Sequence, residues 1–460
     1  MKNSEELRQQ LRSINRKSYP AYKGLKGLYH FGNYILSIDH VQGDPFASPS
    51  HVSIQISHRD AGFPVEYYKD TLTGTTLCDY LTRQFEKQVS QYSFRAKGSG
   101  KSGLLTASHC GQEILSRTAC EITEKGITAR FFVGFPANGR TINATELEKI
   151  LFDFLPVCIQ KSFFYSSLNA KELQNYIELA EDQEFIRQTL PAKNLCAFIA
   201  DGSILPRESG ISSRPMKASV PFTSPDSLRI SINLPHKGKI TGMGIPKGIT
   251  LIVGGGYHGK STLLNALELG VYNHIPGDGR EYVITDATAV KLRSEDGRFI
   301  KDVDISMFIN DLPNKKDTRC FSTLDASGST SQAAGIAESI EAGSHLFLLD
   351  EDTSATNFMV RDAFMQQVIQ REKEPITPFL ERAEDLYKKA GISTILVAGS
   401  SGAFFHIADT IIQMDNYVPK DITASVKKLC SQYPLPAVSV TDFQLPHSHR
   451  IMSRPAESSK

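Results

Sequence analysis

Apolar residues recur along the first half of the chain at two different spacings. Leu7, Leu11 and Ile14 lie four and three positions apart, which predicts a helix over residues 4–18. Apolar and polar positions alternate over 51–57 and 127–135, which predicts strands there. Two further helices are predicted, one through Leu147, Ile150, Leu151 and Phe154 and one over about 170–190. Mixed signals of this kind favour an α+β fold for the first half.

A change of composition separates this half from the second. Residues 201–225 are rich in Ser, Pro and Gly and lack periodicity, so we expect a linker or an ordered crossover there. From Ser227 onward, SLRISINL and GKITGMGIP predict antiparallel strands that lead into the apolar strand ITLIV at 249–253. The predicted organisation is an N-terminal domain (1–205), a linker (206–225), a second domain (226–435) and a C-terminal tail (436–460).

A phosphate-binding loop follows the apolar strand. The segment VGGGYHGKSTLL satisfies G-x-x-x-x-G-K-[ST], and a helix with Leu263, Leu264 and Leu267 on one face comes after it. Backbone N–H groups of such a loop wrap phosphates at the start of the helix, where the helix dipole favours anions. The predicted nucleotide contacts are Gly254, Gly255, Gly256, Tyr257, His258, Gly259, Lys260, Ser261 and Thr262.

A second segment, RAKGSGKSGLL at 95–105, shares the letters GKS but does not satisfy the motif. Arg95 occupies the position of the leading glycine, and no apolar strand precedes it. Two interpretations remain open for this segment. It is either a flexible glycine-serine loop with a basic tip or a loop that contacts phosphate or nucleic acid.

An acidic pair ends another apolar strand. Four apolar residues, 346–349, are followed directly by Asp350 and Glu351. With the loop in place, Ser261 and Asp350 are predicted to bind Mg²⁺ and Glu351 to take a proton from the attacking water. Lys260, facing the β- and γ-phosphates, and Glu351 are the predicted catalytic residues. The alternative is a hydrophobic strand capped by an acidic turn.

A turn of small residues precedes the acidic strand. Ser327, Gly328, Ser329 and Thr330 lead into a helix with Ala333, Ile336, Ala337 and Ile340 on one side. Small residues at a helix start leave backbone N–H groups free to reach a γ-phosphate. Viewed alone, the same residues are a good helix cap.

Together these motifs resemble the nucleotide-binding domains of ABC-type ATPases. More narrowly, several blocks are similar to the predicted ATPases of the ABC class, which lack membrane spans; these blocks are VGGGYHGKSTLL, YNHIPGDGRE, RSEDGR, ASGSTSQAA, LLDEDTSATNF, EPITPF, YHFGNYILSIDHVQGDPFASPS, GSGKSG and VGFPANGR. The resemblance covers nearly the whole chain. It implies an α/β P-loop NTPase of ABC type, with a mixed sheet, an antiparallel subdomain and a helical signature segment, joined to an α+β N-terminal domain.

The resemblance also implies a homodimer that binds ATP and Mg²⁺ as a sandwich. Each nucleotide would lie on one subunit's P-loop and be closed by Ser327–Thr330 of the other, with 354–357 crossing between the two sites. ATP binding would bring the subunits together and hydrolysis would separate them.

Three departures from the ABC pattern weaken the expectation of rapid hydrolysis. The signature is Ala-Ser-Gly-Ser-Thr at 326–330 in place of Leu-Ser-Gly-Gly-Gln. No glutamine lies between Ser261 and Gln332, and Glu295, Asp296 and Asp304 are equal candidates to replace the usual one. Gly-Ser-Ser at 399–401 stands where a histidine usually faces the γ-phosphate, so we expect slow turnover.

Composition and charge narrow the partners. The 460 residues are 40% hydrophobic and 22% charged with a formal net charge of +1, so general attraction to polyanions is not expected. Residues 1–101 nevertheless hold an excess of Lys and Arg interleaved with Tyr19, Tyr22, Tyr29, Phe31 and Tyr34. This pattern predicts either RNA or DNA binding or a solvated face over an aromatic core.

Two classes of function therefore stay open: an ATP-driven clamp on RNA or DNA, and a nucleotide-gated scaffold that regulates a protein partner with little hydrolysis. A transporter-associated ATPase ranks third. Seven scattered cysteines, a polar N-terminus and the lack of an 18-residue apolar run predict a soluble cytoplasmic protein without disulfides. No metal other than Mg²⁺ is expected, and His447 and His449 in the tail are interpreted as solvated side chains.

Overall fold

The computed structural model describes residues 1–361, 374–433 and 442–446, which fold into two compact units. Unit 1 comprises Met1–Asp182 and Asn273–Gly277, and unit 2 comprises Gln183–Tyr272 and the described residues from Asp278 onward. The boundary therefore falls before the residue 205 suggested by composition, inside helix α6 (Ala170–Ala192). His447, His449 and most of the predicted tail lie outside the described residues.

A seven-stranded sheet in the order β1-β2-β3-β4-β8-β5, with β7 also paired to β8, forms the centre of unit 1. Its strands are β1 (Lys2–Asn3), β2 (Gly27–His30), β3 (Ile35–His40), β4 (Ser50–Ile56), β5 (Leu105–Thr106), β7 (Cys120–Thr123) and β8 (Gly126–Val133). Two short pairs accompany it, β9 (Ala137–Asn138) with β10 (Thr141–Ile142), and β6 (Glu113–Ile114) with β15 (Asn273–His274).

Three helical regions of unit 1 lie where the sequence predicted them, one of them shortened, whereas α3 and the short α2 were not predicted. They are α1 (Ser4–Ser13), a 3₁₀ turn (Tyr19–Leu25), α2 (His58–Ala61), a 3₁₀ turn (Val65–Tyr67), α3 (Thr71–Ser90), α4 (Ala144–Glu148), a π-helical turn (Lys149–Phe154), α5 (Leu155–Phe163), a 3₁₀ turn (Tyr165–Ser167) and the first part of α6. The helix predicted over 4–18 ends at Ser13 because Arg16 takes a positive φ of 63°, which an α-helix cannot contain.

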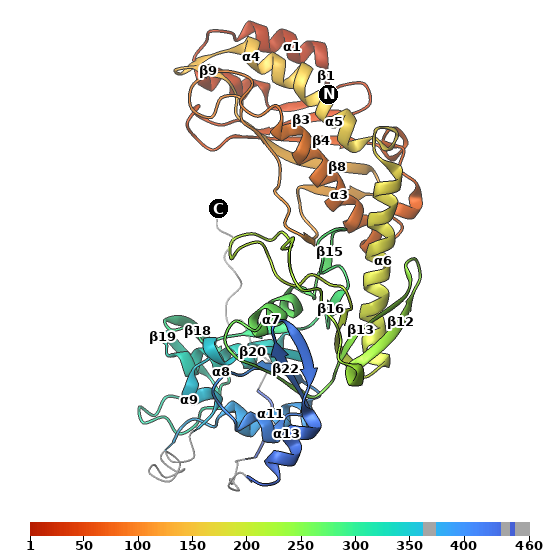
Figure 1. Ribbon diagram of the computed structural model, residues 1–460. Coiled ribbons are helices and arrows are strands. Elements are labelled where there is room, and N and C mark those ends of the chain that lie inside the picture. Colours follow the sequence, from red (N-terminus) through yellow and green to blue (C-terminus); the bar gives the residue numbers. More distant parts are fainter. Residues whose placement is uncertain (362–373, 434–441, 447–460) are drawn as a thin grey trace. The chain divides into compact units, whose positions relative to one another are not determined.

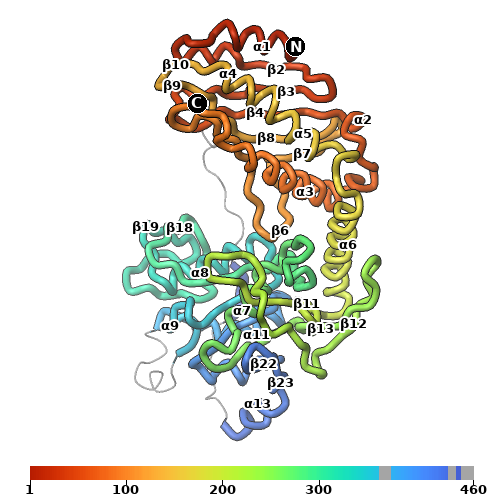
Figure 2. Tube along the Cα trace, turned by 45° about the horizontal axis from the view of Figure 1, so that its top comes forward, coloured from red at the N-terminus to blue at the C-terminus, as the bar shows by residue number. Residues whose placement is uncertain are grey.

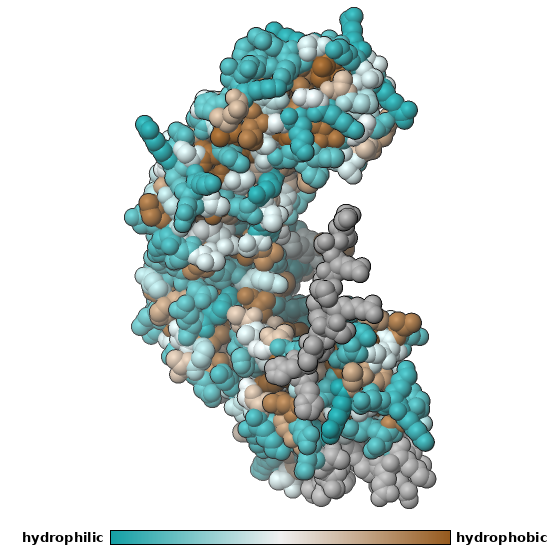
Figure 3. Space-filling model, turned by 180° about the vertical axis from the view of Figure 1, so that it is seen from behind, coloured by the Kyte–Doolittle hydropathy of each residue, from teal (hydrophilic) through white to brown (hydrophobic). Residues whose placement is uncertain are grey.

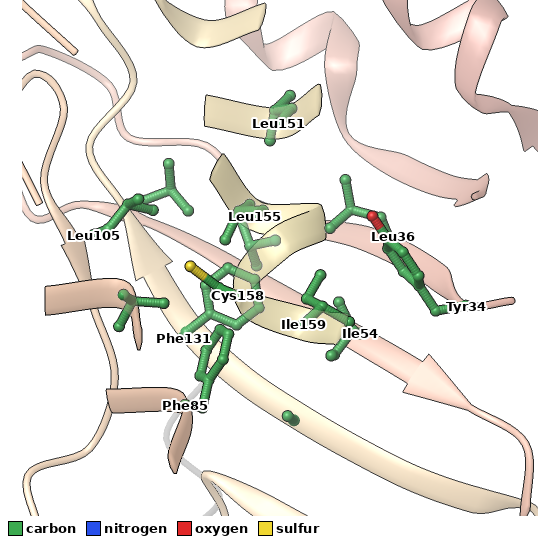
Figure 4. Close-up of a cluster of buried hydrophobic side chains, with 14 of the residues drawn as sticks. Tyr34, Leu36, Ile54, Phe85, Leu105, Phe131, Leu151, Leu155, Cys158 and Ile159 are labelled. Atoms are coloured by element: carbon green, nitrogen blue, oxygen red, sulfur yellow. The ribbon is translucent and has the colours of Figure 1, made fainter. Parts of the chain in front are cut away.

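The core of unit 1 lies between its sheet and helices α3 and α5. Phe85 of α3 meets Phe131 of β8 and Phe163 of α5, each at a ring-centroid distance of 5.1 Å. Figure 4 shows Phe85, Phe131, Cys158 and Ile159 gathered in this layer. Alternate residues of β8 are buried, as the sequence pattern predicted for this strand.

The tyrosines of the basic N-terminal segment belong to this core. Tyr19, Tyr22 and Tyr29 are each at most 1% exposed, and Tyr34 is 7% exposed. The hydroxyl of Tyr19 donates to the carbonyl of Phe135 at 2.9 Å, and that of Tyr22 donates to the carbonyl of Pro136 at 2.7 Å. Buried rings cannot stack on a nucleic-acid base, so the aromatic-core interpretation holds for these four side chains.

Backbone hydrogen bonds hold the GSGKSG segment against neighbouring parts of unit 1, so it is not the flexible loop that one interpretation predicted. Ser99 N donates to Ala137 O at 2.7 Å, Lys101 N to Pro45 O at 2.8 Å, and Gly103 N to Gly134 O at 2.9 Å. A Cβ at Gly103 or Gly134 would clash with backbone carbonyl groups. Glycine is needed in this segment for close packing of backbones.

Unit 2 is built around a six-stranded sheet in the order β17-β20-β21-β14-β22-β23, parallel except for β23. Figure 1 labels two of its strands, β20 and β22. Its strands are β14 (Ile249–Val253), β17 (Val290–Leu292), β20 (Leu346–Asp350), β21 (Ser393–Val397), β22 (Thr410–Asp415) and β23 (Val418–Asp421). The predicted antiparallel strands form a second sheet, made of β11 (Leu195–Ala200), β12 (Arg229–Leu234), β13 (Gly238–Pro246) and β16 (Val283–Thr285). Strands β18 (Arg298–Val303) and β19 (Phe321–Ala326) form a separate antiparallel pair.

Both faces of the parallel sheet are covered. The helices of unit 2 are the last part of α6, α7 (Lys260–Leu269), α8 (Gly328–Glu341), α9 (Thr356–Met359), α11 (Phe379–Ala390), α12 (Phe404–Ile407) and α13 (Thr423–Cys430), with 3₁₀ turns at Asp226–Leu228 and Glu351–Thr353. Leu346 and Leu348 pack with α7, whereas Phe347 and Leu349 pack with α8 and α11. A strand that is buried on both faces has apolar residues at every position. The continuous apolar run LFLL at 346–349 therefore predicts such a strand.

No helix among the described residues combines the length and hydropathy that crossing a bilayer requires. Hydrophilic residues make up most of the coloured surface in the view of Figure 3. All seven cysteines carry free thiols.

The close packing of the GSGKSG segment predicts a stability effect. Gly134→Ala should destabilise unit 1 by about 1–3 kcal/mol, because the new Cβ forces the backbone at Lys101 to move. Gly74→Ala is the matched control, since nothing lies within 4 Å of its Cβ position inside helix α3. Urea denaturation measures both; equal midpoints for the two variants would contradict the packing role.

Candidate functional site

The turn between β14 and α7 has the backbone of an anion-binding loop. Positive φ angles occur at Gly254 (144°), Tyr257 (66°) and Gly259 (98°), so the chain curls before the helix begins at Lys260. Gly259 supplies no side-chain cap, which leaves the N–H groups of the first helical turn open to a ligand. Gly255, Gly256 and Ser261 are exposed, and Thr262 is half-buried.

Lys260 is folded back over this loop. Its Nζ donates to Gly254 O at 2.7 Å and to Gly255 O at 3.0 Å. The ammonium therefore sits on the loop's own carbonyl groups, within the curve of backbone that a phosphate would occupy. A positive charge in this position suits the β- and γ-phosphates.

A hairpin beside the loop holds it in shape. His258 O accepts from Tyr417 N at 3.1 Å, and His258 Nδ1 accepts from Asn416 N at 2.9 Å. A Cβ at Gly254 would clash with Met414 O at the end of β22. The ring of His258 thus fixes the loop, and its backbone is the part suited to a phosphate.

Strand order places the acidic pair at the same sheet edge as the loop. Strand β21 separates β14 from β20, all three are parallel, and Asp350 is in register with Val397 at the end of β21. In open parallel sheets ligands bind at the carboxyl ends of the strands. The loop, Asp350 and Glu351 all follow such ends.

Asp350 is 7% exposed and accepts from Asp352 N at 3.2 Å. Burial is the largest influence on its pKa and raises it, while the ammonium groups of Lys291 and Lys260 act in the opposite direction. The net result is a pKa above the ordinary value. A buried carboxylate that accepts one hydrogen bond, at the same sheet edge as Ser261, fits the oxygen ligands that Mg²⁺ prefers.

Glu351 is gripped by the loop that follows β21. Its Oε2 accepts from Gly399 N at 2.7 Å and from Ser400 N at 3.0 Å, and its Oε1 accepts from Ser400 Oγ at 2.6 Å. Burial alone would raise the pKa of Glu351, but these hydrogen bonds outweigh it and hold the pKa below the ordinary value. The sequence does not predict Ser400 as a partner for Glu351, because the two residues are far apart in the chain and Gly-Ser-Ser at 399–401 signals only the missing histidine.

The turn at Ser327–Thr330 starts α8 without a side-chain cap. Ser327 Oγ lies 3.0 Å from Thr330 Oγ1, and Ser329 Oγ donates to Asn357 Oδ1 at 2.8 Å. The cap interpretation is therefore weakened, because the Ser327 hydroxyl contacts a side chain and not a backbone N–H group. The backbone N–H groups of this turn are left for another acceptor.

Gln332 has a structural role that the sequence motifs do not indicate. It is fully buried, its Nε2 donates to Ser354 Oγ at 3.0 Å, and its Oε1 accepts from Ala355 N at 3.0 Å. It thereby ties α8 to the segment 354–357. A single amide on a helix otherwise lined by small apolar residues was the available signal.

The three acidic substitutes for the absent glutamine have different surroundings. Glu295 N donates to Ser331 Oγ at 2.8 Å, which places Glu295 at the start of α8. Asp296 Oδ1 lies 3.2 Å from the Cβ position of Gly328. Asp304 Oδ1 accepts from the N and Oγ of Ser306 at 3.0 and 2.6 Å. Two of the three candidates therefore lie at the SGST turn.

Fold and site together define an α/β protein of the P-loop class. The chain belongs to the ATPases of the ABC class: residues 169–448 match the P-loop domain of the family named ABC_ATPase, and residues 4–166 match the model described as ATPase of the ABC class N-terminal.

One curated protein is similar to part of this chain. Uncharacterized protein MJ1628 of Methanocaldococcus jannaschii is 31% identical over 266 residues, which cover 55% of this chain and 58% of that protein. The chain thus spans less than two thirds of this curated relative.

Solved structures show only weak likeness. The ADP conformation of MJ1267, an ATP-binding cassette of an ABC transporter, is 13% identical with a TM-score of 0.28, covering 43% of this chain and 89% of that one. CbiO1 from Clostridium perfringens is 14% identical with a TM-score of 0.27, covering 42% and 86%. Similarity at this level carries no functional information.

The hydrogen bonds that Glu351 accepts from Gly399 and Ser400 predict a pH-dependent effect on stability. Because its folded pKa is lowered, the stabilisation is present above the ordinary carboxyl pKa and is lost as pH falls through the lowered value. Ser400→Ala should therefore cost about 1 kcal/mol at neutral pH and less at acidic pH.

Denaturant midpoints at both pH values measure this difference. Ser401→Ala is the control, since the Ser401 hydroxyl accepts from Ala403 N at 3.4 Å and does not contact the carboxylate. A Ser400→Ala effect of the same size at both pH values would contradict the assignment.

Proposed function

We propose that this chain binds Mg-ATP at the edge of the unit 2 sheet and hydrolyses it slowly within a homodimer. The observation that carries the proposal is the convergence of three elements at one edge: the curled loop before α7, the buried Asp350 and the gripped Glu351. Membership of the ABC-class ATPases supports nucleotide binding.

Each side chain has a distinct role in this proposal. The N–H groups of 254–262 and the Lys260 ammonium bind the β- and γ-phosphates. Ser261 and Asp350 hold Mg²⁺, which supplies neutralisation of phosphate charge when bound. Glu351 orients the attacking water and accepts its proton.

A second copy of the chain completes the site. Within one subunit the start of α8 presents uncapped N–H groups, and Gln332 locks this turn to 354–357 as one rigid block. Such a block suits recognition of a γ-phosphate bound to another subunit. In a symmetric pair, each subunit gives its loop to one site and its Ser327–Thr330 turn to the other.

Slow hydrolysis follows from the contacts of Glu351. A carboxylate that already accepts three hydrogen bonds is a weak base, since its lowered pKa reduces its affinity for a proton. Turnover then requires the Gly399–Ser400 loop to release Glu351.

ATP-driven opening and closing acts on a partner that is RNA, DNA or protein. Burial of Tyr19, Tyr22, Tyr29 and Tyr34 removes four of the five rings that suggested base stacking, which favours the scaffold role over a nucleic-acid clamp. Stimulation of ATP turnover by RNA or DNA would reverse this preference. A transport role requires a separate membrane subunit.

The proposal predicts that Glu351→Gln binds ATP but accumulates as a closed dimer. Hydrolysis should fall by about 10²–10⁴-fold because the proton acceptor is lost. Light scattering with and without Mg-ATP measures the dimer, and Lys260→Ala should weaken ATP binding by about 100-fold and stay monomeric.

Asp352→Asn is the matched control, because it removes one negative charge from the exposed neighbour of Glu351. It should hydrolyse ATP as the wild type does. A Glu351→Gln variant that remains monomeric with Mg-ATP would refute the dimer, and undiminished ATP affinity in Lys260→Ala would refute the site.

A further inference from the structure

The hairpin between β22 and β23 carries a tyrosine in an unfavourable backbone conformation. Asp415 pairs with Val418, so Asn416 and Tyr417 form a two-residue turn with φ of 48° and 67° (Figure 2 shows β22 and β23 in blue). Such turns favour Asn at the first position and Gly at the second. Asn416 fits this preference and Tyr417 does not.

Burial does not explain the choice of tyrosine. The Tyr417 side chain is 41% exposed, so a large part of its ring contributes nothing to the core. A non-glycine residue held in the left-handed region is strained, and such strain is concentrated at ligand-binding positions. A contact between the ring and a ligand would offset this strain.

The ring lies against the phosphate loop. A Cβ at Gly259 would be 2.7 Å from Cδ1 of Tyr417, so only glycine leaves room for the ring at the start of α7. Hydrogen bonds from Tyr417 N and Asn416 N to His258 fix the hairpin to the loop. The position of the ring is thus determined by the same residues that shape the phosphate site.

Strand order indicates what the ring faces. The acidic pair ends β20, which lies beyond β21 on one side of β14, whereas β22 and Tyr417 lie on the other side. A triphosphate whose γ-end points toward Asp350 and Glu351 must extend its α-phosphate, sugar and base in the opposite direction. That direction leads to the β22–β23 turn.

We propose that the Tyr417 ring is the platform on which the nucleotide base stacks, an inference that rests on the proposed ATP site. Every base offers a π-face to an aromatic ring, so the platform selects nucleoside triphosphates over inorganic polyphosphate without separating ATP from GTP. Tyr417 is thus a binding residue of this site, supplied by a segment that the phosphate-loop motif does not include.

The test compares ATP, GTP and inorganic tripolyphosphate by calorimetry on the full-length protein. Tyr417→Ala and Tyr417→Gly should weaken ATP and GTP by about tenfold each and leave tripolyphosphate unchanged, because only the stacking contact is removed. Tyr417→Phe should bind all three as the wild type does. Tyr417→Gly should also melt no lower than the wild type, since glycine tolerates the positive φ.

Tyr272→Ala is the matched control. Tyr272 is 43% exposed and follows the far end of α7, about 15 Å from the helix start by the rise per residue. Wild-type affinity for ATP in Tyr417→Ala would overturn the platform. Equal weakening of ATP and tripolyphosphate would overturn it too, because the ring would then act through the loop. A wild-type protein that binds none of the three would overturn the ATP site itself, as Lys260→Ala would independently indicate.

Discussion

The curl of the backbone between β14 and α7 is the constraint on which the other features depend. It turns uncapped N–H groups of α7 toward the edge of a parallel sheet, where the neighbouring strands also end. Because β20 ends at this edge, Asp350 and Glu351 lie at the same edge of the sheet as the loop. Because β22 ends there, a hairpin can clamp the loop through His258.

Features set by local sequence could be predicted, whereas contacts set by strand order could not. The loop, the acidic strand and α8 were predicted because each is a continuous segment with its own periodicity. The grip of Ser400 on Glu351 joins segments 49 residues apart and exists only because β21 lies beside β20. The unit boundary was placed late because β11 is in the antiparallel sheet of unit 2.

The two segments of the chain that contain Gly-Lys-Ser have different structural roles. In both segments two glycines take a positive φ and some allow a close approach of other atoms. The segments differ in their N–H groups: at 98–103 those of Ser99, Lys101 and Gly103 donate to backbone carbonyl groups, whereas the N–H groups that begin α7 have no side-chain cap. A glycine-rich loop holds phosphate only when its N–H groups stay unpaired, which the sequence context signals by a strand before it and a helix after it.

The central claim is that each nucleotide lies between the loop of one subunit and the Ser327–Thr330 turn of the other. The most direct measurement is the ATPase rate of a mixture of Lys260→Ala and Ser327→Glu proteins, each inactive alone. In Ser327→Glu, the added charge suits the start of α8 but repels a phosphate. Mixed dimers hold one intact site, so the account predicts recovery of about a quarter of the wild-type rate. A mixture no more active than its separate components would contradict it.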